Sequence, residues 1–243
     1  MQCSGLPMLE LQAIHTYRGR AQILRQVSLE VGDRESVVLV GRNGAGKTTT
    51  IDSIIGLLPL RSGKITFQGQ DISTLPPYRR ARLGIGYAPE DSGLFPDLTV
   101  EENLQICRLL AKSSGRAAQE SEANDRVYSV FPEVRQFTQR RGLFLSGGQK
   151  KMVAIARAMM LSPAILLLDE PFEGLAPVVV TRLIDAVRKI KEMKISVLIA
   201  ESNLANASRV ADRLYAIDRG EIIYKGDPRQ VMDNKEVMST IHG

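Results

Sequence analysis

The sequence predicts an α/β protein with a mostly parallel sheet at its centre, and three observations carry this prediction. A glycine-rich loop at residues 41–48 stands between a short β-branched run and a helical pattern. A second apolar run, Ile165–Leu168, ends in two adjacent carboxylates. After Pro163 strand-like and helix-like stretches alternate, which is typical of a parallel sheet that helices cover on both faces.

The first part of the chain is expected to add a small antiparallel sheet. Three strand-like runs separated by turn residues predict it: Leu9–Ile14, Val27–Val31 and Ile65–Phe67. Ser36–Val40 has the β-branched composition of a buried parallel strand. The helix after the glycine loop is expected to stop at Pro59, because apolar residues recur at helical spacing only up to that point.

The later elements follow from the same patterns. We expect a helical insertion at about residues 90–160, with helices at Val100–Ala111 and Ala117–Phe131. Behind it come a helix at Val178–Glu192, a strand at Ile195–Ala200 and a hairpin: Arg213–Asp218 and Glu221–Tyr224. Residues 8–235 are predicted to form one domain.

Composition narrows the classes of function. The 243 residues carry a net charge of +5 and contain no apolar run of the roughly 18–20 residues that cross a bilayer. Basic residues come in short clusters with acids between them, which favours solvated surface over a nucleic-acid interface. The first residues show no signal peptide. Cys3 and Cys107 match no metal or redox spacing, so free thiols in a reducing, cytoplasmic compartment are expected.

The glycine-rich loop fits the phosphate-binding pattern G-x-x-x-x-G-K-[ST] at every fixed position. Glycines let backbone N–H groups surround a triphosphate. The lysine places a positive charge near the outer phosphates, and the hydroxyl after it can bind Mg²⁺. The nucleotide-binding candidates are Gly41, Arg42, Asn43, Gly44, Ala45, Gly46, Lys47, Thr48 and Thr49.

A phosphate loop alone leaves kinase, GTPase, helicase and transporter ATPase open, and two further motifs decide between them. Asp169 and Glu170 end a strand at the edge where open α/β sheets bind ligands. Asp169 is the candidate to hold Mg²⁺ through water, and Glu170 to accept a proton from the water that attacks the γ-phosphate. An acidic pair that only caps a helix is the alternative.

The second motif is Leu145-Ser146-Gly147-Gly148-Gln149. Ser146 is a plausible N-cap of the apolar helix that follows, and a Ser-Gly-Gly helix start offers N–H groups and a positive dipole end to an anion. Ser146, Gly147, Gly148 and Gln149 are therefore candidates for a second phosphate-binding element, unless they form an ordinary glycine-rich cap.

In this order and spacing, the three motifs resemble the ATP-binding subunits of ABC transporters over about residues 8–230. The resemblance implies a P-loop NTPase core of the RecA-like type that binds ATP and Mg²⁺. It also implies that two subunits pack head to tail, each signature loop completing the other's site. Closing with ATP and opening after hydrolysis would then move separate membrane subunits.

Narrower features are similar to the ATPases of bacterial or archaeal importers of branched-chain amino acids, urea or amides. They are Tyr87-Ala-Pro-Glu90-Asp91, the following Leu94–Asn103, and Glu173-Gly-Leu-Ala-Pro177. The branch implies a complex of this chain (the shorter ATPase type), a second and different ATPase, two permease subunits and an external substrate-binding protein. The permeases would dock near Glu90–Asn103, which would place this chain at the cytoplasmic face of the membrane.

Three positions depart from the general family pattern. Glu90 replaces the usual glutamine and can still bind Mg²⁺. Ala176 stands where the D-loop usually has aspartate. Ser202 aligns with the switch histidine, and a serine cannot hold a proton near neutral pH. We therefore expect Glu170 to carry hydrolysis, with Ser202 at best reaching the γ-phosphate through water; a poorly hydrolysing site driven by the partner ATPase is the alternative.

Adenine stacking is assigned to Tyr17, with the guanidinium plane of Arg18 as the alternative. Two other functions stay open at this point. One is a regulatory nucleotide-binding subunit with weak hydrolysis, which Ser202 motivates. The other is a soluble ATPase acting on nucleic acid, although the chain has neither a second nucleotide domain nor a long coiled-coil insertion.

Overall fold

Two sheets and a group of helices make up the computed structural model, which describes residues 6–113 and 120–242. Some sequence predictions fall on residues outside these ranges. They concern Cys3, the first residues of the chain (predicted to form no signal peptide) and the start of the expected helix Ala117–Phe131. Within the described ranges, no helix is both long and apolar enough to span a bilayer.

The smaller sheet is antiparallel and confirms the expected N-terminal unit. Its strand order is β2-β1-β4-β5. The strands are β1 (Leu9–Arg18), β2 (Ala21–Val31), β4 (Leu60–Phe67) and β5 (Gln70–Asp71). They are longer than predicted, because polar ends such as residues 15–18 of β1 still pair with β2 although apolar patterning stops before them.

The larger sheet is mixed and has the order β10-β9-β3-β8-β7-β6. Its strands are β3 (Ser36–Val40), β6 (Ile85–Ala88), β7 (Ile165–Asp169), β8 (Ser196–Glu201), β9 (Arg213–Asp218) and β10 (Glu221–Gly226). All neighbours run parallel except β9 and β10, which form the expected hairpin. Strand β6 was not predicted. It is only four residues long and contains Gly86, where an added Cβ would lie 2.8 Å from Leu166 Cδ2.

The parallel register brings the candidate residues to one edge of this sheet. Val40 of β3 lies opposite Glu201 of β8, and Asp169 of β7 lies opposite Ala200. The loops that follow β3, β7 and β8 therefore start side by side, which is where open α/β sheets bind ligands.

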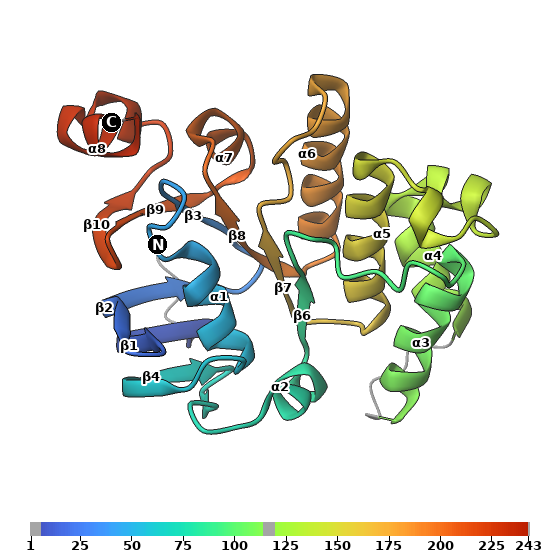
Figure 1. Cartoon of the computed structure of the whole chain (residues 1–243), viewed down its shortest axis with the longest axis horizontal. Helices are drawn as coiled ribbons and strands as arrows, with labels where there is room; N and C mark the ends of the chain where they lie inside the picture. Colours follow the sequence, from blue (N-terminus) through green and yellow to red (C-terminus); the bar gives the residue numbers. More distant parts are fainter. Residues whose placement is uncertain (1–5, 114–119, 243) are drawn as a thin grey trace.

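Helices cover the larger sheet from several directions (Figure 1). They are α1 (Lys47–Ile55), α2 (Pro77–Leu83), α3 (Val100–Ser113), α4 (Glu120–Val130), α5 (Gly147–Met160), α6 (Pro177–Glu192), α7 (Leu204–Val210) and α8 (Lys235–His242), with short 3₁₀ turns at Pro132–Phe137, Gly142–Phe144 and Val231–Asp233. Helices α3, α4 and α5 pack on one another and form the predicted insertion. The boundaries 8–235 of the whole domain stay a prediction.

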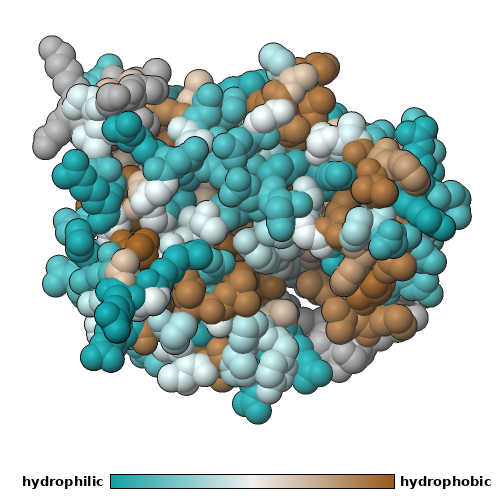
Figure 2. Space-filling view, viewed as in Figure 1, coloured by the Kyte–Doolittle hydropathy of each residue, from teal (hydrophilic) through white to brown (hydrophobic). Residues whose placement is uncertain are grey.

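The core lies on both faces of the larger sheet, as alternating residues of its strands show. Val38 and Val40 of β3 face α5 and α6, whereas Val37 and Leu39 face α1 and the antiparallel sheet. Figure 2 shows that apolar side chains also reach the surface of the helical part at the right of the view. Exposed examples there include Leu109, Leu143 and Phe144.

Candidate functional site

The phosphate loop is folded around the amine of its own lysine. Lys47 Nζ donates to the carbonyl oxygens of Gly41 at 2.7 Å and Arg42 at 3.1 Å, and only 4% of this side chain is exposed. Gly44 and Gly46 adopt left-handed φ angles of 83° and 116°, which glycine tolerates without a Cβ clash. The loop thus has the turns that let backbone N–H groups face an anion at the start of α1.

A cavity of ≈ 360 Å³ opens beside this loop and brings together residues of the phosphate loop with Glu90 and Glu170. Its lining residues come from the antiparallel sheet, the phosphate loop and the ends of β6 and β7: Arg18, Ile23, Asn43, Gly44, Gly46, Lys47, Thr48, Thr49, Glu90, Glu170 and Glu173. Gly41, Arg42 and Ala45 belong to the loop but do not line the cavity. Glu173 was not predicted as a site residue, although its place three residues after Glu170 indicated it.

Asp169 is positioned to take part in metal binding. Thr48 Oγ1 donates to Asp169 Oδ1 at 3.3 Å, while Oδ2 is buried with no hydrogen-bond partner in the described residues. Burial raises the pKa of Asp169 to about 6, an effect that a bound cation would oppose. The hydroxyl and the orphaned carboxylate oxygen are the hard ligands that Mg²⁺ prefers. Glu90 is exposed and lines the same cavity.

No group of three His, Cys, Asp or Glu side chains within residues 6–113 and 120–242 could hold a metal ion alone. This agrees with Mg²⁺ chemistry, because Mg²⁺ keeps several waters and is usually held by one or two carboxylates together with substrate phosphates. Thr48, Asp169 and Glu90 therefore fit a site that is completed by a nucleotide. Their assignment as metal ligands stays a prediction.

The carboxylate of Glu170 lies between Lys47 and Ser202. Its Oε1 is 3.0 Å from Lys47 Nζ, and both side chains are about 5% exposed or less. Its Oε2 accepts hydrogen bonds from Ser202 N at 3.0 Å and Ser202 Oγ at 3.1 Å. The hydroxyl of Ser202 therefore contacts Glu170 itself, which sequence reasoning did not anticipate. The predicted base, the phosphate-loop lysine and the switch residue form one connected group.

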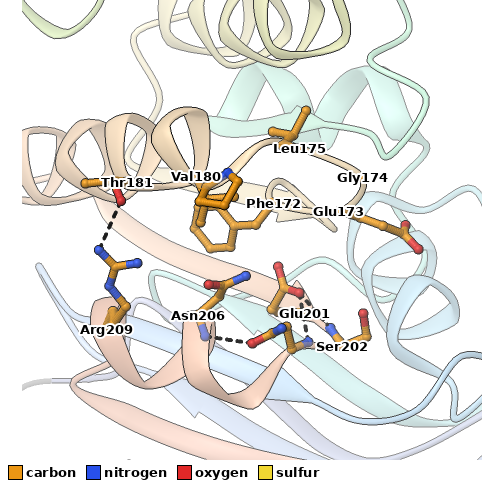
Figure 3. Close-up of a pocket in the computed structure, with 12 residues that line it drawn as sticks. Phe172, Glu173, Gly174, Leu175, Val180, Thr181, Glu201, Ser202, Asn206 and Arg209 are labelled. Carbon is orange, nitrogen blue, oxygen red and sulfur yellow. Dashed lines mark hydrogen bonds between the residues drawn. The ribbon is translucent and has the colours of Figure 1, made fainter.

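Glu201 is a buried carboxyl group that the sequence analysis missed. Its side chain lies beneath a second cavity of ≈ 440 Å³ between β8, α6 and α7 (Figure 3). Oε1 accepts from the amides of Ser202 at 3.0 Å and Asn203 at 2.9 Å, whereas Oε2 is buried and accepts no hydrogen bond from an N–H or O–H donor of the described residues. Burial, joined by the nearby charge of Glu170, raises the pKa of Glu201 to about 7. The available signal was a glutamate ending a strand that neighbours Asp169-Glu170.

This buried acid makes stability depend on pH. The pKa of Glu201 is above its ordinary value of 4.5, so its contribution is fully present below about pH 4.5 and is lost as pH rises through about 7. We expect the nucleotide-free protein to lose about 2–3 kcal/mol between pH 5 and 8 from this group. Glu201→Gln, which stays neutral, should remove that part of the slope and be more stable at pH 8. Urea unfolding in EDTA at pH 5 and pH 8 measures the free energy of unfolding of the wild type and the variant. An equal change between the two pH values in both proteins would contradict the expectation.

The signature segment begins α5 as expected. Ser146 Oγ accepts from Gln149 N at 3.3 Å, and Gln149 Oε1 accepts from Ser146 N at 3.0 Å, which forms a capping box. Ser146 and Gly147 are exposed, while Gly148 packs against Val179, where an added Cβ would lie 2.7 Å from Cγ1. None of the four residues lines the cavity beside Lys47.

The assignment of Tyr17 to adenine stacking stays a prediction, as does the alternative Arg18. Tyr17 does not line the cavity, and its hydroxyl donates to Gln22 on the neighbouring strand at 3.1 Å. Because successive side chains of a strand point to opposite faces, Arg18 takes the inward position. Its guanidinium binds Asp52 and donates to Thr49 Oγ1 at 3.2 Å. Of this pair, Arg18 is the residue that lines the cavity.

Comparison with known proteins agrees with this geometry. The family model described as "ABC transporter" matches residues 24–173. The chain is 38% identical over 222 residues to the lipopolysaccharide export system ATP-binding protein LptB of Haemophilus influenzae, covering 91% of each chain. It is 34% identical over 236 residues to the high-affinity branched-chain amino acid transport ATP-binding protein BraG of Pseudomonas aeruginosa, covering 97% of this chain and 100% of BraG.

Solved structures show the same fold. An ATP-binding cassette of an ABC transporter in its ADP conformation superposes with a TM-score of 0.84 at 28% identity, over 98% of this chain and 99% of that one. A dimeric cassette in a post-hydrolysis state bound to ADP and phosphate superposes with a TM-score of 0.79 at 25% identity, over 91% and 99% of the two chains.

Proposed function

The chain belongs to the family of ABC transporter ATP-binding proteins, and we propose that it is the ATP-hydrolysing subunit of a bacterial or archaeal importer of branched-chain amino acids or related small amino acids and amides. The observation that carries the hydrolytic part is the contact of Glu170 with both Lys47 and Ser202 beside the phosphate loop. The end-to-end match to BraG supports the importer branch.

The cavity residues divide the work of hydrolysis. The phosphate loop and Lys47 bind the triphosphate, and Lys47 exchanges its contact with Glu170 for a phosphate oxygen. Mg²⁺, where Thr48, Asp169 and Glu90 would hold it, would neutralise charge on the phosphates. Glu170 orients the attacking water and accepts its proton. Ser202 holds Glu170 in place through hydrogen bonds that its backbone amide and its hydroxyl donate, and neither donor has to change its protonation state for that role.

ABC ATPase subunits dimerise and act with membrane permeases, and for this chain we propose a head-to-tail dimer with a different ATPase. The exposed start of α5 supports it, because Ser146 and Gly147 face away from the chain's own cavity. Such a pair would sit peripherally at the cytoplasmic face of the membrane, against two permeases that receive substrate from an external binding protein. Nothing in the site calls for nucleic acid.

The segment Glu90–Asn103 remains the proposed permease contact. Phe95 is 46% exposed within it. Leu143 N donates to Pro96 O at 2.9 Å, so the exposed Leu143 and Phe144 lie beside this segment. An apolar surface next to Glu90, which also lines the nucleotide cavity, would let a docked permease sense the nucleotide.

One alternative rests on the relatives. LptB is at least as similar in identity as BraG, and its name assigns it to lipopolysaccharide export. A second rests on Ser202 in place of histidine, which would suit a regulatory subunit with weak hydrolysis. The contact between Ser202 and Glu170 favours hydrolysis over that alternative.

The complete transporter tests the proposal. The chain should be purified with the permeases and second ATPase encoded beside it, and reconstituted in vesicles with the cognate binding protein. We expect ATP-dependent uptake of labelled leucine, isoleucine or valine, or of a small amide. Extraction of lipopolysaccharide from the vesicles, or hydrolysis that no binding protein stimulates, would refute the importer assignment.

A further inference from the structure

Lys151 joins two loops that the proposed function treats separately. It lies on α5, two residues after Gln149, the last signature residue. Its Nζ donates to Glu90 O at 2.7 Å and to Glu170 O at 2.6 Å. Glu90 follows β6 and begins the proposed permease contact, while Glu170 follows β7 and is the proposed catalytic base. One side chain therefore touches the signature helix, the permease-side loop and the catalytic loop.

The backbone of Glu170 needs such support. Its φ angle is +45°, in the left-handed region that non-glycine residues rarely adopt. Residues in this conformation persist at functional sites only where their surroundings fix them. Glu170 N donates to Ala200 O at 2.9 Å, and Glu170 O accepts from Lys151 Nζ. The two hydrogen bonds hold the backbone amide and carbonyl of this residue, and so set the direction of its side chain.

Four acidic groups lie around the ammonium group of Lys151. Desolvation lowers the pKa of Lys151, and the charges of Glu90, Glu173, Asp169 and Glu170 partly oppose that shift. Lys151 is half-buried, so these interactions are less screened than those of a surface lysine. A neutral side chain of similar length would remove the shorter of the two hydrogen bonds to Glu170 O, leaving only the longer one from Glu173 N at 3.4 Å, and would also remove the hydrogen bond to Glu90 O.

We propose that Lys151 is a positioning residue that couples Glu170 to both the signature helix and the Glu90 loop, so that Glu170 is aligned only when these two elements are in place. The inference rests on the proposed function of Glu170 as catalytic base. It gives a physical route by which permease docking at Glu90 and nucleotide binding at the start of α5 reach the catalytic carboxylate, since a movement of either element changes the same two hydrogen bonds.

The test compares three variants of this chain in the complete transporter. Lys151→Met keeps the length and removes the donor; Lys151→Arg keeps a cation with several donors. Lys150→Met removes an equal charge from the preceding residue, which makes no hydrogen bond or ion pair with Glu90 or Glu170 in the described part of the chain. For each, kcat, KM for ATP, and the ratio of ATPase rates with and without loaded binding protein are measured.

We expect Lys151→Met to lower kcat at least tenfold, to leave KM for ATP within about twofold and to bring the stimulation ratio close to one. Lys151→Arg should recover part of the kcat and part of the stimulation ratio, and Lys150→Met should match the wild type in all three quantities. An unchanged kcat, or a loss shared equally by Lys150→Met, would overturn the proposal. So would a large rise in KM, because the residue would then serve ATP binding.

Two controls separate this proposal from others. If Lys151→Met fails to assemble, Lys151→Gln, which retains an N–H donor, is measured instead against the same expectations with a smaller loss. If the wild-type complex hydrolyses ATP but imports none of the proposed substrates, the importer assignment fails while the kcat comparison still decides the role of Lys151.

Discussion

Replacing Glu170 by glutamine is expected to lower ATP turnover by about 10²- to 10⁴-fold while ATP still binds. The amide keeps an oxygen that can accept from Ser202 N, so the local geometry should survive. It cannot accept a proton from water at neutral pH, and it loses the charge that faces Lys47. Phosphate release by the assembled complex, with the substitution in this chain alone, measures the effect.

Glu173→Gln is the matched control for Glu170→Gln. Glu173 also lines the cavity, but it is exposed and touches neither Lys47 nor Ser202. Its substitution should change turnover by less than about threefold, since it removes no contact to the reacting group. Full turnover with Glu170→Gln would instead place hydrolysis in the partner ATPase and make this chain the regulatory member.

Elements whose sequence pattern and chemistry agree were predictable. The β-branched strand Ser36–Val40, the glycine loop and the start of the helix at Lys47 fall where expected, because burial pattern and turn chemistry specify the same structure there. The end of this helix was predicted wrongly: it stops at Ile55, where Gly56 forms a left-handed C-cap, and does not reach Pro59. The signature helix was predictable for the same reason: Ser146 and Gln149 form a capping box at its start. These local signals need no knowledge of distant contacts.

What escaped prediction depends on contacts between distant segments. Strand β6 is only four residues long and contains Gly86, so it carries little pattern of its own, and it forms because it pairs with β7. The burial of Glu201 follows from the parallel register of β3, β7 and β8, and this register between distant strands could not be predicted from the sequence. The choice between Tyr17 and Arg18 depends on which face of β1 meets the phosphate loop, and the shifts in register along β1 obscure that alternation.

The second large effect is expected for Lys47→Met, which should lower both ATP affinity and stability. Its effect differs from that of Glu170→Gln for an electrostatic reason. Lys47→Met removes the charge that binds phosphate, so ATP affinity should fall about 10- to 100-fold. The substitution also removes the cation that pairs with the carboxylate of Glu170, a side chain that is only 5% exposed. A buried ion pair that loses one member costs about 3–5 kcal/mol of stability. Glu170→Gln should cost less stability, because the ammonium group of Lys47 keeps its hydrogen bonds to the carbonyl oxygens of Gly41 and Arg42.

The double variant Lys47→Met/Glu170→Gln distinguishes these causes. With no charge left in the pair, it should be more stable than Lys47→Met alone, although it carries one more substitution. Urea unfolding of the wild type, both single variants and the double variant, without nucleotide, completes the cycle. If the double variant is less stable than Lys47→Met, the cost lies in lost packing rather than in an unpaired charge. In that case Lys47 stabilises the phosphate loop by packing, and its charge does not position Glu170 before the nucleotide binds.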